Sequence, residues 1–287
     1  MRRIAHLSDL HFGRTDPEVV RGAIDAVCRL KPDLVVVSGD LTQRARSHQF
    51  RAARAFLDRL PKPQIVVPGN HDVPLWNLFA RGLSPLRKYR RNITRDLEPF
   101  FADDEIAVLG LNTARSLTIK DGRINRQQID VAVARFSAGA PHCLHILVTH
   151  HPFDQPDKGD AGDIVGRAVM AMSAIGDRVD LILSGHLHLA RSESSAQRYP
   201  GSGALLILAG TATSTRRRGE ANAFNLLQVE RNALTLQRHE WAPSLGAFAE
   251  AQLQIFERSE RGWSNAGPRT ESAPAKRDEI LGPDRSG

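Results

Sequence analysis

The chain has 287 residues, 41% of them apolar, which is enough to bury a real core in one large domain or two small ones. Its formal charge of +7 favours anionic partners such as phosphate esters, nucleic acid or a lipid surface, although the basic residues are scattered as on a solvated surface. Cys28 and Cys143 lie too far apart in the chain to suggest a disulfide framework, so we expect two buried thiols in a reducing, cytoplasmic compartment. Polar residues interrupt the apolar stretch near the N-terminus, which excludes a signal peptide or a membrane span there.

The first part of the chain alternates apolar strands with amphipathic helices. Strands are predicted at 3–8, 33–40 and 64–70. A helix is predicted at 17–30, and a second one is marked by apolar residues at helical spacing, which are Phe50, Ala53, Leu57 and Leu60. Continuous apolar strands that alternate with helices indicate a largely parallel sheet buried on both faces.

The pattern continues with weaker periodicity through the middle of the chain. A basic helical segment extends to about residue 97; further strands are predicted at 105–113, 144–150 and 179–186, and helices at 125–139 and about 165–175. From residue 191 onward strands alternate with turns, which predicts a meander that completes a second sheet. We assign residues 1–265 to one domain and expect 266–287, which is rich in Pro, Ser, Gly and charge, to be a disordered tail.

Residues of metal-ligand type follow five of the apolar strands. They are Asp9 and His11, then Asp40, then Asn70, His71 and Asp72, then His150 and His151, then His186 and His188. Each group alone is weak, because Asp and Asn are also common turn residues and a histidine can be a core residue. The carboxyl ends of parallel strands face a common crevice, however, so these side chains are expected to converge there. Their joint occurrence in this order favours a metal site.

The expected donors form a mixed oxygen and nitrogen set without thiolate. Such a set suits Mn, Fe, Co or Zn in a catalytic role rather than a closed structural zinc site. Seven or more donors, including a carboxylate that can bridge, exceed the needs of one ion. They predict two metal ions about 3.5–4 Å apart, an arrangement that activates a water and holds a phosphoryl group.

The motifs DLH, GD, GNHD, THHP and GHLH resemble those of the calcineurin-like metallophosphoesterase superfamily over about residues 1–229. The resemblance implies a four-layer α/β/β/α sandwich with two mixed sheets and metal-dependent hydrolysis of phosphoric esters through attack by hydroxide. It also implies that one metal binds Asp9, His11 and His188, that Asp40 bridges, and that the other binds Asn70, His150 and His186. His71 corresponds to the family's histidine that donates a hydrogen bond or proton at the phosphate, and Asp72 is expected to orient the turn.

The substrate class is indicated only in part. The stretch GDLTQRA lacks the longer GDxVDRG pattern of protein Ser/Thr phosphatases, which argues against that activity. The stretches GDLT, GRINRQQI and HHPF are more similar to bacterial class III phosphodiesterases, which implies a small phosphodiester such as a cyclic nucleotide or a glycerophosphodiester. That branch often has Asp where this chain has Gln43, so the identity of the ester stays open.

Three alternative functions are also considered. A phospholipid-processing hydrolase or a nuclease would use the same chemistry, and a non-catalytic scaffold of this fold is disfavoured because no ligand position is missing. The basic stretch at 213–225 lies just after a predicted strand, so Arg216 or Arg217 is a candidate contact for a substrate phosphate, with a solvated turn as the alternative.

Overall fold

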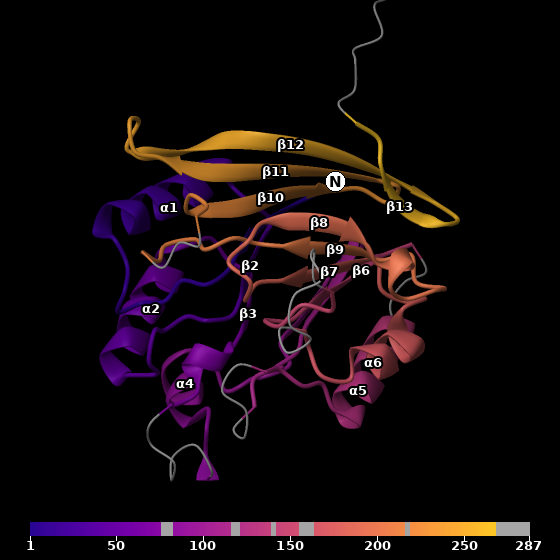
Figure 1. Cartoon of the computed structure of the whole chain (residues 1–287), viewed down its shortest axis with the longest axis horizontal. Helices are drawn as coiled ribbons and strands as arrows, with labels where there is room; N and C mark the ends of the chain where they lie inside the picture. The colour runs from indigo at the N-terminus through magenta and orange to yellow at the C-terminus, as the bar shows by residue number, and fades with distance from the viewer. Residues whose placement is uncertain (76–82, 116–120, 139–141, 155–163, 216–218, 268–287) are drawn as a thin grey trace, which may run out of the picture.

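The computed structural model describes residues 1–75, 83–115, 121–138, 142–154, 164–215 and 219–267. Two mixed β-sheets lie face to face, and helices cover the outer face of each (Figure 1). This arrangement confirms the predicted four-layer α/β/β/α sandwich. The expected disorder of the C-terminal tail concerns residues that are mostly outside the described ranges, so it stays a prediction, as does the domain boundary at 265.

The first sheet has seven strands in the order β13-β12-β11-β10-β1-β2-β3. Its strands are β1 (Arg2–Leu7), β2 (Leu34–Ser38), β3 (Gln64–Val67), β10 (Ala223–Val229), β11 (Ala233–Ala242), β12 (Ala247–Ser259) and β13 (Gly262–Asn265). Strands β1, β2 and β3 are parallel, with Ile4 opposite Leu34 and Val36 opposite Ile65. Their carboxyl ends therefore lie at one edge of the sheet, which positions the loops that follow them side by side.

The second sheet has six strands in the order β4-β5-β6-β7-β9-β8. Its strands are β4 (Phe100–Ala102), β5 (Ile106–Gly110), β6 (Leu144–Val148), β7 (Leu181–Ser184), β8 (Arg191–Ser194) and β9 (Leu205–Leu208). The four inner strands are parallel, and β4 and β8 pair antiparallel at the two edges. Side chains from both sheets, including Val36, Ile146 and Leu227, are fully buried between them. The strands read as nearly continuous apolar runs because both of their faces are covered.

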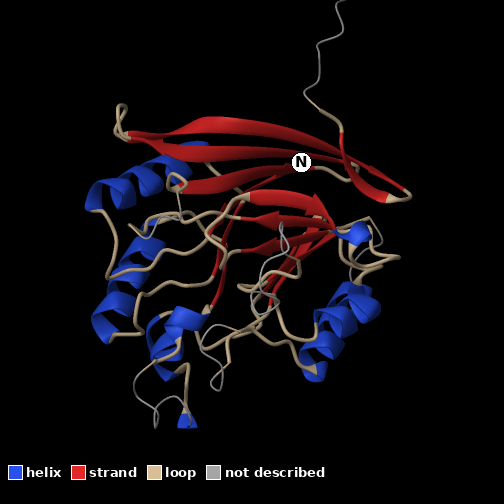
Figure 2. Ribbon diagram, in the orientation of Figure 1, coloured by secondary structure: helices blue, strands red, loops and turns tan. Residues whose placement is uncertain are grey.

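The helices pack on the outer faces of the sheets (Figure 2). They are α1 (Pro17–Leu30), α2 (Ser47–Arg59) and α4 (Arg87–Asn92) on the first sheet, and α5 (Arg126–Ser137) and α6 (Ala168–Ile175) on the second. Helix α1 begins where it does because the Asp16 side chain accepts the backbone N–H of Glu18 at 2.9 Å and Pro17 occupies the first turn.

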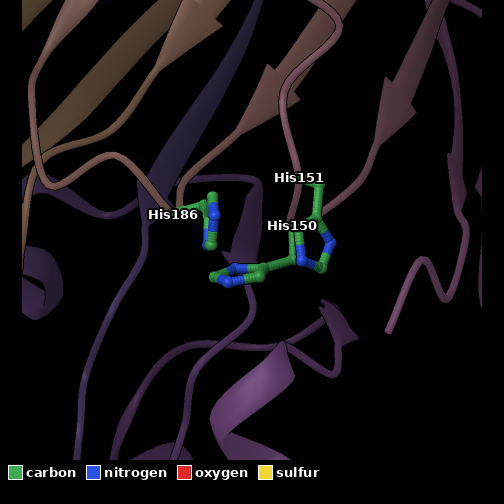
Figure 3. Close-up of side chains that lie close together, drawn as sticks. All are labelled: His150, His151 and His186. Carbon is green, nitrogen blue, oxygen red and sulfur yellow. The ribbon is translucent and has the colours of Figure 1, made fainter. Parts of the chain in front are cut away.

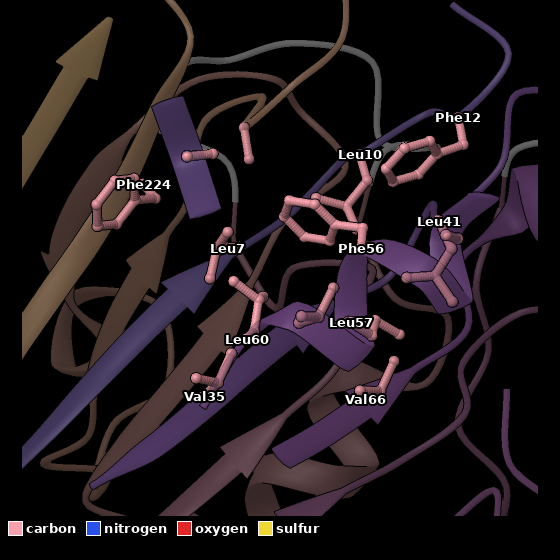
Figure 4. Close-up of a cluster of buried hydrophobic side chains, with 14 of the residues drawn as sticks. Leu7, Leu10, Phe12, Val35, Leu41, Phe56, Leu57, Leu60, Val66 and Phe224 are labelled. Carbon is pink, nitrogen blue, oxygen red and sulfur yellow. The ribbon is translucent and has the colours of Figure 1, made fainter. Parts of the chain in front are cut away.

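The layer beneath α2 is a continuous apolar cluster. Leu7, Val35 and Val66 project from the sheet toward Phe56 and Leu57 of the helix, and all five are buried (Figure 4). The loops that carry the candidate ligands thus extend from a fully packed scaffold.

One part of the predicted topology is wrong. Of the strands expected after residue 191, β9 joins the second sheet beside β7, but β10 and β11 return to the first sheet, where β10 pairs with β1. The predicted meander therefore does not complete the second sheet. Strand β1 is interior, so it needs a partner on each side, and periodicity does not reveal which sheet supplies it.

Two smaller expectations can also be compared with the structure. Cys143 is buried as predicted, but Cys28 is exposed near the end of α1. Within the described ranges, no helix combines the length and the apolar character needed to cross a bilayer.

Candidate metal centre

The predicted site residues gather where strands of both sheets end. In chain order they are Asp9, His11, Asp40, Asn70, His71, His150, His186 and His188. The aspartates and histidines among them form overlapping groups, each with ligand-type atoms within 4.8 Å of one another, and the Asn70 side chain contacts His150. The structure therefore brings all eight predicted residues into one cluster.

The first group consists of Asp9, His11 and His188. The Nε2 atoms of His11 and His188 lie 3.4 and 3.5 Å from the same oxygen, Oδ1 of Asp9. The two imidazole rings are parallel, with centroids 5.1 Å apart. All three side chains are buried. Two ring nitrogens and one carboxylate oxygen therefore converge in a space from which water is largely excluded.

Asp40 lies between the first group and the second. Its Oδ2 is 3.7 Å from Nε2 of His11, and its Oδ1 is 3.4 Å from Nε2 of His150. Oδ1 also accepts the backbone N–H of His71 at 2.8 Å. One carboxylate thus reaches both groups, which is the geometry expected of a bridging ligand.

The second group is built around His150. Its Nδ1–H donates to the carbonyl oxygen of Ser38 at 2.8 Å, and its Nε2 lies 3.1 Å from Oδ1 of Asn70. The rings of His186 and His151 complete a set of three neighbouring imidazoles (Figure 3). The centroid of His186 is 5.1 Å from that of His150 and 4.6 Å from that of His151.

His71 lies beside the first group with a fixed ring orientation. Its Nδ1–H donates to the backbone carbonyl of Gln43 at 2.9 Å, and its ring packs edge-on against His11 with centroids 4.9 Å apart. Related phosphodiesterases often have Asp where this chain has Gln43. Because the hydrogen bond from His71 goes to the backbone carbonyl, it does not depend on the side chain at position 43.

The turn after β3 is fastened to the loop after β2 through Asp72. The buried carboxylate accepts the backbone N–H groups of Gly69, Leu41 and Thr42 at 3.0, 3.1 and 2.9 Å. Burial and the charge of Asp40 raise the pKa of Asp72 to about 6, against the effect of these hydrogen bonds. Asp72 therefore supports the turn, as predicted.

The two loops also approach each other too closely for any side chain at Gly69. A Cβ atom there would lie 2.1 Å from Oδ1 of Asp40 and 2.4 Å from its backbone nitrogen.

Several candidate ligands have an uncommon backbone conformation. The φ angles are 53° at Asp9, 49° at His11, 51° at Asp40, 74° at His186 and 59° at His188. Residues other than glycine rarely adopt this left-handed region, which costs about 1–3 kcal/mol each and is found mainly at functional sites. The surrounding packing therefore holds these loops in strained conformations that point the side chains inward.

The charges in the cluster support one another. Burial opposes ionisation of Asp9 and Asp40, but the neighbouring histidines outweigh it and hold the pKa of both carboxyls below the usual range. Burial likewise disfavours the charged form of His150, yet Asp40 raises its pKa to about 9. Burial and the charge of His150 lower the pKa of His186 to about 3. The site thus combines two anionic carboxylates with at least one neutral imidazole.

The residues present fit metal ions. Among the described residues, nothing forms a hydrogen bond with Oδ1 of Asp9 or with either ring nitrogen of His11, although these atoms are buried. Buried polar atoms nearly always have a partner, so a cation is the missing partner that this donor set suits. In addition, Nδ1–H of His150 is committed to Ser38, so Nε2 is the ring atom that faces Oδ1 of Asn70, and once it loses its proton both atoms are free to bind a cation. A shared cation would satisfy both.

The sequence did not reveal the residues that hold these ligands in place. Nδ1 of His188 is hydrogen-bonded to the hydroxyl of Thr211, and Nδ1 of His151 to that of Thr113 at 2.8 Å. Both threonines are distant in the sequence from their partners and have no motif of their own. The Ser8 hydroxyl donates to Oδ2 of Asp9 at 2.8 Å. Of these supporting residues, only Ser8 could have been suspected from the sequence, because it directly precedes a candidate ligand.

The candidate substrate contacts Arg216 and Arg217, with Arg218, lie outside the described residues, so their role stays a prediction.

Buried carboxylates and imidazoles at the carboxyl ends of strands in an α/β/β/α sandwich define a class of metal-dependent hydrolases. The family model described as "Calcineurin-like phosphoesterase" matches residues 2–190, and the chain belongs to this family. The protein is accordingly a metal-dependent phosphoesterase, which confirms the resemblance seen in the motifs.

Individual relatives agree with this assignment. A probable cyclic nucleotide phosphodiesterase from Synechococcus sp. is 28% identical over 200 residues, which cover 65% of this chain and 73% of the relative. A cAMP/cGMP dual specificity phosphodiesterase from Mycobacterium tuberculosis is 26% identical over 256 residues, which cover 79% and 75%.

A solved structure supports the fold. The purple acid phosphatase PPD1 from yellow lupin (Lupinus luteus) superposes with a TM-score of 0.69 over 91% of this chain at 12% identity. At this identity the likeness concerns the fold alone, and the chain spans about half of that phosphatase, 54% of its length.

Proposed function

We propose that this protein is a phosphodiesterase that hydrolyses a small phosphodiester, a cyclic nucleotide or a glycerophosphodiester, at a centre with two metal ions. The observation that carries the proposal is the position of Asp40, whose two oxygens lie within 3.7 Å of histidines from separate groups. The names of the two phosphodiesterase relatives support a diester rather than a monoester substrate.

In this proposal Asp9, His11 and His188 would hold one ion, Asn70, His150 and His186 would hold the other, and Asp40 would serve both. The bound ions would supply hydroxide near neutral pH by lowering the pKa of a water and would neutralise phosphate oxygens. Manganese, iron, zinc and cobalt all suit these donors.

The chain itself positions the remaining proton donor. Because Nδ1–H of His71 is bound to the Gln43 carbonyl, Nε2 is the ring atom that acts toward the phosphate. Protonated there, His71 stabilises the developing charge or gives its proton to the leaving alkoxide, a role that contributes about 10²–10⁴-fold. Asn70 adds an oxygen donor without adding negative charge, which keeps the site attractive to an anionic ester.

The proposal is tested by loading the metal-free protein separately with Mn²⁺, Zn²⁺, Co²⁺ and Fe²⁺. Each form is assayed with bis(p-nitrophenyl) phosphate, p-nitrophenyl phosphate, cyclic AMP and glycerophosphocholine. We expect diester hydrolysis to exceed monoester hydrolysis. Asn70→Ala should lower kcat/KM at least about tenfold, because even residues that only orient metal ligands have effects of 10–100-fold. Asn232→Ala, an exposed position in the turn between β10 and β11, is the matched control.

Absence of activity with every metal, or an Asn70→Ala variant as active as Asn232→Ala, would contradict the proposal. A clear preference for the monoester would retain the metal chemistry but exclude the diester substrate.

A further inference from the structure

Three arginines lie together beside the second group of candidate ligands. Arg115 ends the described part of the loop after β5, Arg123 lies just before α5, and Arg167 directly precedes α6. They come from three separate segments. The fold therefore assembles a basic cluster that is not visible as a charge run in the sequence.

Backbone hydrogen bonds join these three segments. The N–H of Arg123 donates to the carbonyl of Thr113 at 2.9 Å, two residues before Arg115. On the other side, the N–H of Gly166 donates to Gly122 at 2.8 Å, and that of Ile124 donates to Gly166 at 3.1 Å. Arg123 and Gly166 thus pair as neighbours in a short parallel bridge. The segment that carries Arg123 is therefore hydrogen-bonded on one side to the segment that leads to Arg115 and on the other side to the segment that leads to Arg167. These bonds hold the three segments side by side.

The same segments border the metal centre through His151. The hydroxyl of Thr113 is hydrogen-bonded to Nδ1 of His151, and a Cβ atom at Gly122 would lie 2.2 Å from the His151 ring. His151 in turn lies against His186 of the second group. The arginine cluster is therefore adjacent to the centre rather than on a remote face.

The cluster has no acidic partner within the described ranges. No ion pair there involves any of the three arginines, and Arg115 donates to neutral groups, the Gln128 Oε1 at 2.7 Å and the Asn112 carbonyl at 3.2 Å. Burial, followed by the charges of Arg123 and Arg167, lowers the pKa of Arg115. Arg123 and Arg167 are exposed. Mutually repelling cations at the rim of an active site are stabilised by an anion, and guanidinium groups match phosphate oxygens in a bidentate geometry.

We propose that Arg115, Arg123 and Arg167 form a subsite for a second phosphate group of the substrate. The preferred substrate is then a small phosphodiester that carries another phosphate, separate from the one that is cleaved. This inference rests on the proposed phosphodiesterase function and specifies its substrate class.

The test uses a matched pair of substrates, thymidine 5′-(p-nitrophenyl phosphate) with and without a 3′-phosphate. Bis(p-nitrophenyl) phosphate serves as the baseline because it has no second phosphate. The variants are Arg123→Gln, Arg167→Gln and the double variant, with Arg51→Gln on the exposed face of α2 as the control. Binding of thymidine 3′,5′-bisphosphate and thymidine 5′-phosphate is measured in parallel by calorimetry.

We expect the full chain to prefer the 3′-phosphorylated ester about tenfold in kcat/KM, as one charge-assisted contact provides. The double variant should lose this preference and bind the bisphosphate correspondingly more weakly. Hydrolysis of bis(p-nitrophenyl) phosphate should change by less than about twofold, and Arg51→Gln should match the unmodified chain throughout.

The outcomes separate the two proposals. Hydrolysis of bis(p-nitrophenyl) phosphate without any preference within the matched pair overturns the subsite and leaves the phosphodiesterase function standing. Absence of all hydrolysis overturns the function, and the calorimetry then decides the subsite by itself. If the double variant loses stability but keeps its substrate ratio, the arginines support the fold rather than bind the substrate, and the subsite is refuted.

Discussion

Gly69→Ala tests whether the close approach of the loops after β2 and β3 is required for the metal centre. The φ of Gly69 is −106°, which alanine adopts without strain, so the substitution acts through space alone. The added Cβ would lie 2.1 Å from Oδ1 of Asp40 and 2.4 Å from its backbone nitrogen. Contacts between such atoms are rarely below 3.0 Å, so the two loops must separate by about 1 Å.

The displaced residue is the one that lies between both groups of candidate ligands. A shift of about 1 Å in a catalytic arrangement can cost about 10²-fold in rate, and overpacking a core costs about 1–3 kcal/mol. We therefore expect Gly69→Ala to lower kcat/KM for bis(p-nitrophenyl) phosphate about 10²-fold. It should also bind fewer than two equivalents of Mn²⁺ in elemental analysis, while its circular dichroism spectrum stays native.

Gly210→Ala is the matched control. A Cβ at Gly210 would meet Ala190 and Ala223 at 3.7 Å, which is ordinary contact. The same substitution there should leave activity and metal content within about twofold. If Gly69→Ala retains the activity of Gly210→Ala, the close approach at Asp40 has no part in catalysis and the reasoning is refuted.

Three further predictions concern the ligand supports, the core and the metal-free state. Thr211→Val removes the hydroxyl bound to Nδ1 of His188 and should weaken binding of one metal ion about 10–100-fold in titration calorimetry. Thr211→Ser keeps the hydroxyl and should bind the metal as the unmodified chain does. Equal metal affinities of the two variants would exclude a supporting role for Thr211. Leu57→Ala, at a fully buried position on the inner face of α2, should lower the free energy of unfolding in urea by about 2–5 kcal/mol, whereas Leu245→Ala, 67% exposed, should change it by less than about 0.5 kcal/mol. In the metal-free protein, Asp40 outweighs burial and raises the pKa of His150 from 6.5 to about 9, so the stability that this pair contributes is complete below pH 6.5 and lost as the pH rises through 9. Thermal melts in chelator should therefore show that the free energy of unfolding falls between these pH values, on the order of 3 kcal/mol at most. The His150→Gln variant should not show this fall. A parallel fall in the variant would show that another group is responsible.

Local patterns in the sequence predicted most of the elements, because each strand and helix has its own periodicity. The helix expected at 17–30 is α1, Pro17–Leu30, since its start is determined by Asp16 and Pro17 alone. The assignment of strands to sheets was less accurate. Whether β10 joins the first or the second sheet depends on which interior strand lacks a neighbour, and that is a property of the whole fold.

The candidate ligands could be found for a related reason. Each lies directly after an apolar strand, so a local pattern marks it. Thr113, Thr211 and the three clustered arginines could not be found in this way, because their roles depend on contacts with residues many positions away. The roles expected of Arg216 and Arg217 stay predictions.

The pairing of β1 with β10 affects the order in which the protein can assemble during synthesis. The loops that carry Asp9, Asp40 and Asn70 leave the ribosome early, but one side of β1 stays without its neighbour until residues 223–229 have been made. The second sheet, with His150, His186 and His188, is also complete before that point. The last strands of the chain therefore close a scaffold whose ligands are already present. A chain that ends before β10 would carry every ligand motif but leave β1 unpaired on one side.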